Sequence, residues 1–250
     1  MITSVAKIAA LTLAIPTTLT AACLLYLNHK VSPQVIAGTR VRHTPWDKFT
    51  SITRKPTCTP PDVANENSEW ILAEERVTSR PVALSHLEPT SLSFLLTKYI
   101  RATMTAFGNT PQVYLLRRMM PREDIVAESF SRDRIRSLEF DVGHLVYGVW
   151  RVAHRGGDSD EKERVELAME APAGYRGPVV EGVVVVGVER VDEEHVVFVN
   201  EMWMWRRPGQ KKVMLESAAG RWFHTLLSSW LVVRGVEALT GVGLEGGGNL

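Results

Sequence analysis

The second half of the chain places a series of strand-like segments directly before one long apolar helix. This order restricts the fold more than any other feature. The strand-like segments are rich in Val, Phe and Trp, are separated by turns, and cover residues 140–154, 164–170, 179–191 and 195–206. A helix is predicted from about Ser217 to Leu239, with apolar side chains around most of its circumference, which is typical of a buried helix. An antiparallel sheet curved around this helix buries the apolar surface of both, so an α+β domain is predicted.

The segment before these strands predicts further local structure. Ser91 is placed to cap a helix that continues to Gly108, with apolar residues along one broad face. The short apolar run from Val113 to Leu116 predicts a strand. Pro121, followed by three charged residues, predicts the start of a second helix, since Pro and acidic residues favour the first helical turn.

The N-terminus contains an uncharged segment of twenty residues, from Ile8 to Leu27. A bilayer core of about 30 Å is spanned by about 20 apolar residues in a helix. We therefore expect a single-pass transmembrane anchor at residues 8–27, and the alternative is a cleaved signal peptide. Lys30, Arg40 and Arg42 follow the segment, which favours a cytosolic location for the domain at an endomembrane such as that of the endoplasmic reticulum.

These patterns divide the chain into five parts. Five prolines and many polar residues between residues 28 and 67 predict a tether between the anchor and the domain. The predicted parts are an N-terminal flank (1–7), the anchor (8–27), a Pro-rich tether (28–67), the α+β domain (68–240) and a Gly-rich tail (241–250).

Charge and cysteine content exclude several classes of function. The 29 basic residues nearly balance the 28 acidic ones, so a nucleic-acid partner is not expected. Two cysteines, one of them in the N-terminal apolar segment, are too few for a disulfide-stabilised domain or a Cys-based zinc site. The sequence lacks nucleotide-binding glycine motifs and His-based metal spacings, and therefore no cofactor and no metal are predicted.

Three polar side chains within apolar segments are the candidates for catalysis. His224 lies on the C-terminal helix, where an imidazole can serve as a general acid or base. Asn200 and Glu201 interrupt the last strand and, by alternation, face opposite sides of the sheet. Two of them have a structural alternative: His224 as a hydrogen-bonded core residue, and Glu201 as a solvent-facing side chain or a partner of Arg206 or Arg151.

Aromatic side chains are the candidates for ligand binding. Trp203 and Trp205 share one face of the last strand and are placed to form an aromatic wall. Tyr147 and Trp222 are further candidates to line a pocket. The alternative for Trp203 and Trp205 is an ordinary place in the core.

Residues 140–239 carry a resemblance to the helix-grip superfamily, which includes START lipid-transfer domains and polyketide cyclases. The similar positions are Gly174-Tyr175-x-Gly177, Glu181-Gly182, Gly187-x-Glu189, Trp203-x-Trp205 and Gly220-Arg221-Trp222. With its predicted anchor and Trp-rich strands, the chain also resembles membrane-anchored accessory proteins of fungal natural-product pathways. Both resemblances imply a cavity between sheet and helix that holds an apolar small molecule.

Two functions of different classes therefore remain open. The first is a pocket for an apolar small molecule at a membrane, with a cyclisation or isomerisation as the reaction if the pocket is catalytic. The second is a non-catalytic membrane adaptor whose apolar surface assembles with partner proteins into a heteromeric complex.

Overall fold

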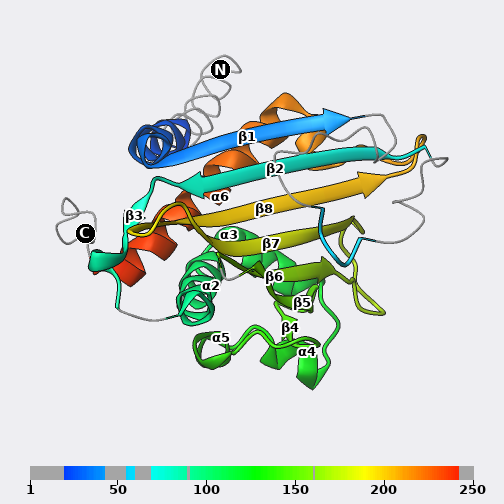
Figure 1. Ribbon diagram of the computed structural model, residues 1–250. Helices are drawn as coiled ribbons and strands as arrows, with labels where there is room; N and C mark the ends of the chain where they lie inside the picture. Colours follow the sequence, from blue (N-terminus) through cyan, green and yellow to red (C-terminus); the bar gives the residue numbers. More distant parts are fainter. Residues whose placement is uncertain (1–19, 43–54, 60–68, 89–90, 160, 242–250) are drawn as a thin grey trace, which may run out of the picture.

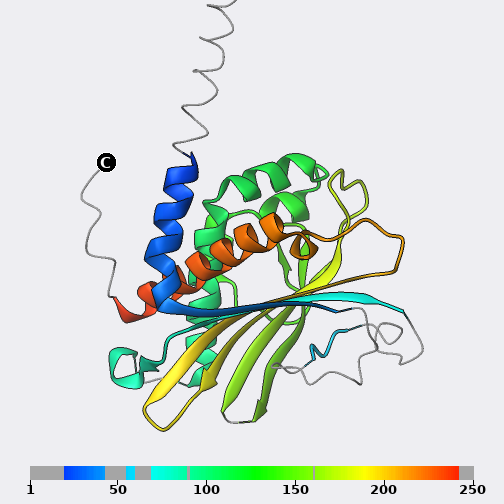
Figure 2. The same ribbon diagram turned by 90° about the horizontal axis from the view of Figure 1, so that it is seen from above.

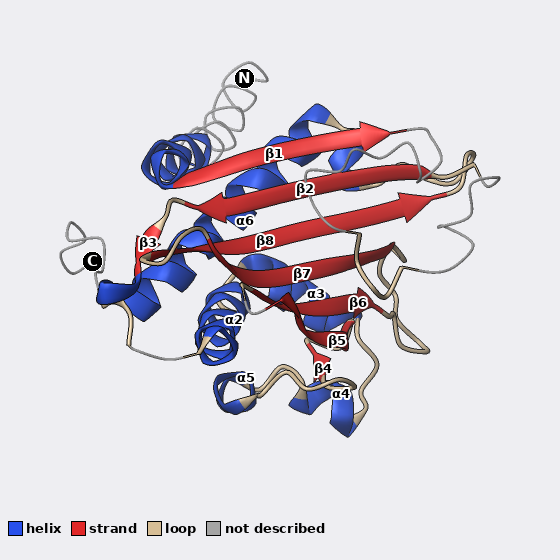
Figure 3. Ribbon diagram, viewed as in Figure 1, coloured by secondary structure: helices blue, strands red, loops and turns tan. Residues whose placement is uncertain are grey.

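The computed structural model describes residues 20–42, 55–59, 69–88, 91–159 and 161–241, which form an α+β unit with one antiparallel sheet (Figures 1 and 3). The strands are β1 (Val35–Arg42), β2 (Ile71–Ser79), β3 (Val82–Ala83), β4 (Leu145–Val146), β5 (Trp150–Ser159), β6 (Lys162–Met169), β7 (Glu181–Arg190) and β8 (His195–Arg206). The α-helices are α2 (Leu92–Gly108), α3 (Pro111–Met119), α4 (Asp124–Glu128), α5 (Arg132–Ser137) and α6 (Ala218–Thr240), and another helix covers residues 20–31. Short 3-10 turns are η1 (Ser32–Gln34), η3 (Leu84–His86) and η4 (Met214–Glu216).

The sheet combines a meander with two strands from the N-terminal half. Its strand order is β1-β2-β8-β7-β6-β5-β4, and β3 pairs separately with β8. Strands β5 to β8 follow one another in sequence and in space, so the predicted antiparallel meander is confirmed. Strand β2 pairs with β8 on one side and with β1 on the other, which joins the two ends of the domain in one sheet.

The α-helices lie on one face of the sheet, which we call the inner face (Figure 2). Side chains from α2 and from the inner face of the sheet form the main core, which includes Leu96, Tyr99, Ile100, Leu167, Val188 and Phe198. Helices α2 and α6 pack closely because α6 has Gly235 at the contact. A Cβ atom at that position would lie 2.4 Å from a ring carbon of Tyr99 and 2.7 Å from the methyl group of Thr103.

Both long helices form close to where the sequence predicts them. The Ser91 hydroxyl accepts a hydrogen bond from the Phe94 amide at the start of α2. Ser217 caps α6 in the same way through the Gly220 amide, at 3.0 Å. Gly241 ends α6 in the left-handed conformation, with φ of 68°, which glycine adopts without steric cost.

Two local predictions in the helical region are wrong. The predicted strand from Val113 to Leu116 lies inside α3, which starts at Pro111. Its buried residues, Val113 and Leu116, are three positions apart and so face the core from one side of a helix. The predicted second helix begins later than Pro121, at Asp124, because Glu123 has extended backbone and serves as the N-cap.

Strand boundaries also differ from the prediction. The segment 140–154 contains a break, because Tyr147 and Gly148 have φ values of 48° and 70° and turn the chain between β4 and β5. Strands β1 and β2 were not predicted at all, and β1 lies within the segment 28–67 that was expected to be a tether. Residues 43–54 and 60–67 of that segment lie outside the described residues, as does the tail after Gly241.

The predicted transmembrane anchor falls largely outside the described residues. Residues 20–27 belong to the helix that covers residues 20–31, and Leu24 and Leu27 pack against a cluster that includes Val233 of α6. Within the described ranges no helix combines the length and the apolar character needed to cross a bilayer.

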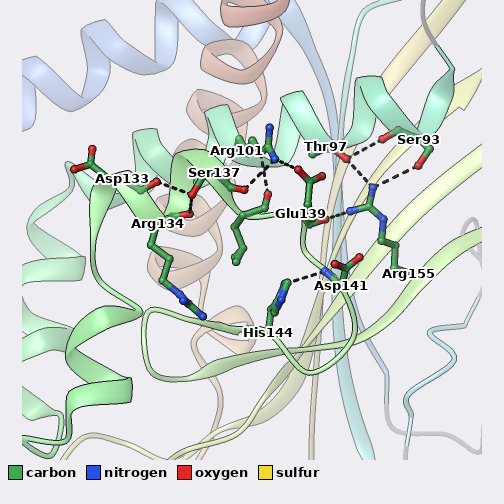
Figure 4. Close-up of polar contacts among 11 residues, drawn as sticks. Ser93, Thr97, Arg101, Asp133, Arg134, Ser137, Glu139, Asp141, His144 and Arg155 are labelled. Carbon is green, nitrogen blue, oxygen red and sulfur yellow. Dashed lines mark hydrogen bonds and ion pairs between the residues drawn. The ribbon is translucent and has the colours of Figure 1, made fainter.

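A polar clamp attaches the segment before β4 to helix α2 (Figure 4). Arg101 donates to the main-chain carbonyls of Ser137 and Leu138, at 3.1 and 2.8 Å, and to the Glu139 carboxylate. Arg155 donates to the Glu139 carbonyl and, at 2.6 Å, to the Thr97 hydroxyl. These bonds satisfy the carbonyl of the last residue of α5 and those of the two residues that follow it, outside any helix or strand.

Candidate functional site

A small cavity of about 80 Å³ lies between helices α2 and α6 and the inner face of the sheet. Its lining is mainly apolar and includes Phe107, Trp150, Val184, Met202, Leu227 and Leu231. The polar residues of its lining are Thr103 of α2, Gln112 of α3, Asn200 and Glu201 of β8, and His224 and Ser228 of α6. A mainly apolar lining with a few polar groups is typical of small-molecule sites, whose usual volume of about 300–1,000 Å³ is larger than that of this cavity.

His224 and Glu75 form a buried pair at the α6 side of this cavity. Strand alternation places Glu75 of β2 on the inner face, between Ala73 and Val77, where α6 crosses the strand. The His224 Nδ1 atom lies 2.5 Å from the Glu75 Oε2 atom. Both side chains are buried, with 7 % of His224 and 2 % of Glu75 exposed.

Two hydroxyl groups of α6 complete the environment of the Glu75 carboxylate. Thr225 donates to Oε1 at 2.5 Å, and Ser228 donates to Oε2 at 3.0 Å. Burial raises the pKa of Glu75. The hydrogen bonds from His224, Thr225 and Ser228, together with the positive charge of His224 when its ring is protonated, outweigh burial, so the pKa is lower than that of an ordinary glutamate. Glu75 is therefore a carboxylate near neutral pH and accepts all three bonds.

This arrangement fixes the chemistry available to His224. A carboxylate at Nδ1 places the ring proton on that atom, so the proton faces Glu75. The other ring nitrogen, Nε2, is then the basic atom that can take up a proton. Glu75 would stabilise the imidazolium that results, as a carboxylate does in catalytic dyads and triads.

Asn200 joins His224 at the cavity, so two of the three predicted catalytic residues come together. The Tyr99 hydroxyl donates to the Asn200 Oδ1 atom at 3.0 Å. Tyr99 is fully buried, and burial raises its pKa well above the ordinary value. Tyr99 thus stays neutral and holds the Asn200 amide in one orientation.

Glu201 lies on the opposite, outer face of the sheet, as the alternation predicts. It forms an ion pair with Arg76 of β2 and accepts a hydrogen bond from the Trp203 indole at 3.1 Å. Burial raises the pKa of Glu201, and the Arg76 charge only partly offsets this effect. Arg76 also pairs with Glu189 at 3.0 Å, so the Glu201 carboxylate belongs to an ion-pair network across three strands.

The alternative that paired Glu201 with Arg206 or Arg151 is wrong. Arg206 pairs with Glu216 at 2.6 Å, and Arg151 pairs with Glu170 at 2.8 Å. The partner is Arg76 because β2, which the sequence did not reveal, lies beside β8 and places residue 76 opposite residue 201.

The four predicted ligand-binding aromatics lie in three separate places. Trp203 and Trp205 pack on the outer face in a cluster with Trp70. Trp222 is 41 % exposed in the first turns of α6. Tyr147 is buried in the main core, where its hydroxyl donates to the Met104 carbonyl at 2.7 Å. None of them is among the residues that line the cavity.

A second hollow, of about 450 Å³, lies near the edge of the sheet formed by β1 and β2. Its lining includes Ile36, Arg40, Arg76 and Val197. Although it is larger, the guanidinium of Arg76 is already engaged by the two carboxylates described above. The inner cavity is the better candidate because it holds a base whose partner and orientation are fixed.

Sequence reasoning missed Glu75, the partner of His224, and Trp150, which lines the cavity. The signal for Glu75 is a single carboxylate among Ile71, Ala73 and Val77, which share a face of β2. It was overlooked because this segment was not predicted as a strand. Trp150 was predicted to lie in a strand. The turn at Tyr147, which determines the face of the sheet from which the Trp150 side chain projects, was not predicted.

The described residues contain no group of three or more His, Cys, Asp or Glu side chains arranged to hold a metal ion. Comparisons of the chain with protein-family models, with curated proteins and with solved structures found no match.

Proposed function

We propose that this domain binds an apolar small molecule in the cavity beneath α6 and moves a proton on it through His224. The observation that carries the proposal is the Glu75–His224 pair at the wall of a mainly apolar cavity. The position of α6 along the inner face, with the cavity between helix and sheet, supports the helix-grip-like arrangement suggested by the sequence. A single base in such a cavity suits an isomerisation or a cyclisation.

In this proposal Nε2 of His224 removes a proton from one position of the ligand and returns it at another. Glu75 keeps the imidazole in the required tautomer and stabilises its protonated form. The apolar lining excludes water, which strengthens the electrostatic interaction between the two side chains. Asn200, held by Tyr99, orients the ligand next to the base.

Attachment to a membrane through residues 8–27 is part of the proposal. Leu24 and Leu27 pack against the domain, which leaves residues 8–23 for the bilayer. As a helix these would extend roughly 24 Å, less than the bilayer core of about 30 Å. Retention of the full chain in the membrane pellet after carbonate extraction tests this part, and its release into the supernatant would contradict it.

The binding step can be tested without knowing the ligand. The full chain is purified, its bound small molecules are extracted, and mass spectrometry compares them with those of a Leu227→Trp variant, in which the larger side chain fills the cavity. We expect a molecule that accompanies the wild type and His224→Gln but not Leu227→Trp. The same extract from all three proteins would overturn the assignment of the cavity.

Proton transfer is tested separately with the molecule so identified. In deuterated water the wild type should incorporate deuterium into the molecule, whereas His224→Gln should bind it without incorporation. Glu75→Gln should bind it and exchange more slowly, because the imidazolium loses its counter-charge. Equal exchange by the wild type and His224→Gln would show that His224 does not transfer the proton. The domain would then be a binding protein without this catalytic step.

The adaptor function remains the second candidate, because four large apolar side chains are exposed on two helices. Tyr114 and Leu115 of α3 are 63 and 58 % exposed, and Trp222 and Phe223 of α6 are 41 and 44 % exposed. Exposed apolar groups of this size often mark contact surfaces. A stable heteromeric complex in detergent that is lost in a Leu115→Ser, Phe223→Ser variant, with the cavity extract unchanged, would favour this function.

A further inference from the structure

One polar group on a residue that lines the cavity has no hydrogen-bond partner in the part of the chain that the structure describes. It is the indole N–H of Trp150, which is buried. The ring is held by edge-to-face contacts with Phe107, at 5.3 Å and 69°, and with Tyr147, at 6.3 Å and 83°. A buried donor without an acceptor is destabilising, and such groups in native proteins call for an explanation.

Trp150 lies at the opposite end of the cavity from the His224 and Asn200 pair. Trp150 is the first residue of β5, whereas Asn200 is in β8. Strands β6 and β7 separate them, and three interstrand steps of about 4.8 Å place the two backbones roughly 14 Å apart. Between them the floor of the cavity is apolar and includes Val184 and Val186 of β7.

The lining contains no Lys or Arg side chain among its described residues. A ligand carboxylate or phosphate would therefore find no counter-charge other than the His224 ring, which already pairs with the Glu75 carboxylate, and burying it would be strongly unfavourable. A neutral oxygen acceptor, such as a carbonyl, gives the Trp150 N–H a partner without bringing a charge into the cavity.

We propose that the ligand of this cavity is a neutral, mainly apolar molecule whose carbonyl-type oxygen accepts a hydrogen bond from Trp150 Nε1. This inference rests on the proposed function, since it assigns a ligand class to the same cavity. Trp150 selects the ligand and fixes its direction, so that its other end lies next to His224 and Asn200.

The experiment uses two probes with the same ring and similar volume, cyclohexanone and the hydrocarbon methylenecyclohexane. Binding of each to the full chain is followed by NMR on protein with ¹⁵N-labelled tryptophan, and the Trp150 indole resonance is identified by its loss in Trp150→Phe. We expect cyclohexanone, but not methylenecyclohexane, to shift this resonance strongly. The ratio of the two dissociation constants should change about 5-fold in Trp150→Phe, which is the effect of one hydrogen bond.

The outcomes separate the two proposals. If both probes bind and the Trp150 resonance responds equally to each, the carbonyl inference is wrong while the cavity remains a binding site. If neither probe binds at its solubility limit, and Leu227→Trp gives the same spectra, both the inference and the proposed binding function fail. The ratio of constants also cancels any general loosening of the cavity in Trp150→Phe, because that change affects both probes alike.

Discussion

Replacing Glu75 with glutamine tests the buried pair at the centre of the site. The substitution keeps the size of the side chain but removes the charge that accepts bonds from His224, Thr225 and Ser228. A hydrogen bond to a charged group contributes about 1.5–3 kcal/mol and a neutral one about 0.5–1.5 kcal/mol, so each of the three loses roughly 1 kcal/mol. We expect the free energy of unfolding to fall by about 3 kcal/mol in total, or roughly 6–12 °C in Tm for a domain of this size.

The effect should depend on pH in a defined direction. Because the pKa of Glu75 is lower in the folded protein than the ordinary value of 4.5, its stabilisation is complete above that value. It is lost as the pH falls through the lowered pKa, since a protonated glutamate resembles glutamine. The stability difference between wild type and Glu75→Gln should therefore be largest near pH 7 and shrink below about pH 4.5.

Urea unfolding of the purified full chain, followed by tryptophan fluorescence at pH 7 and at pH 4, measures both effects. Glu193→Gln is the matched control, because Glu193 is exposed in the turn between β7 and β8. The reasoning fails if Glu75→Gln is no less stable than this control at pH 7. A difference of the same size at both pH values would show that Glu75 does not act through its charge.

Three further variants test other parts of the structure. Gly235→Ala should lower the free energy of unfolding by about 1–2 kcal/mol in urea unfolding, because the steric cost of its methyl group against the α2 side chains exceeds the gain in helix propensity. Gly38→Ala is the control and should have little effect, because the space around residue 38 is open. Burial, together with the Glu166 charge, raises the pKa of Cys58 to about 12. Glu166→Gln should therefore raise the rate at which a thiol reagent modifies Cys58 at pH 8, measured with the other cysteine replaced by serine. An unchanged rate would contradict this account. Arg101→Ala should lower the free energy of unfolding by about 1 kcal/mol, because the exposed Ser137 carbonyl and the partly buried Leu138 carbonyl lose their donor, and amide exchange there should accelerate.

The sequence was informative where periodicity and end signals agree. Helix α6 has apolar residues around it, Ser217 before it and Gly241 after it, and its predicted range differs from the observed one by one residue at each end. Strand β8 was predicted with its observed bounds, and the alternation within it placed Asn200 and Glu201 on the correct faces. In these segments local pattern and tertiary environment favour the same structure.

The failures have a common physical cause. Strand β2 carries Glu74, Glu75 and Arg76 in its centre, so its pattern resembles an exposed segment. The charges are tolerated because β8 and α6 supply Arg76 and Glu75 with partners from distant parts of the sequence. A sequence alone does not show such partners, and both the Glu75–His224 pair and the true partner of Glu201 were therefore missed.

The place of β2 in the sheet has a consequence for how the chain folds during synthesis. Strand β2 leaves the ribosome early, but its partner β8 is among the last strands to appear, and α6, which buries Glu75, comes later still. The meander of β5 to β8 consists of neighbouring hairpins and can assemble first, whereas closing the long loop back to β2 is entropically slow. Until then β2 presents an unpaired edge with apolar residues, so the nascent chain is most prone to aggregation just before helix α6 is complete.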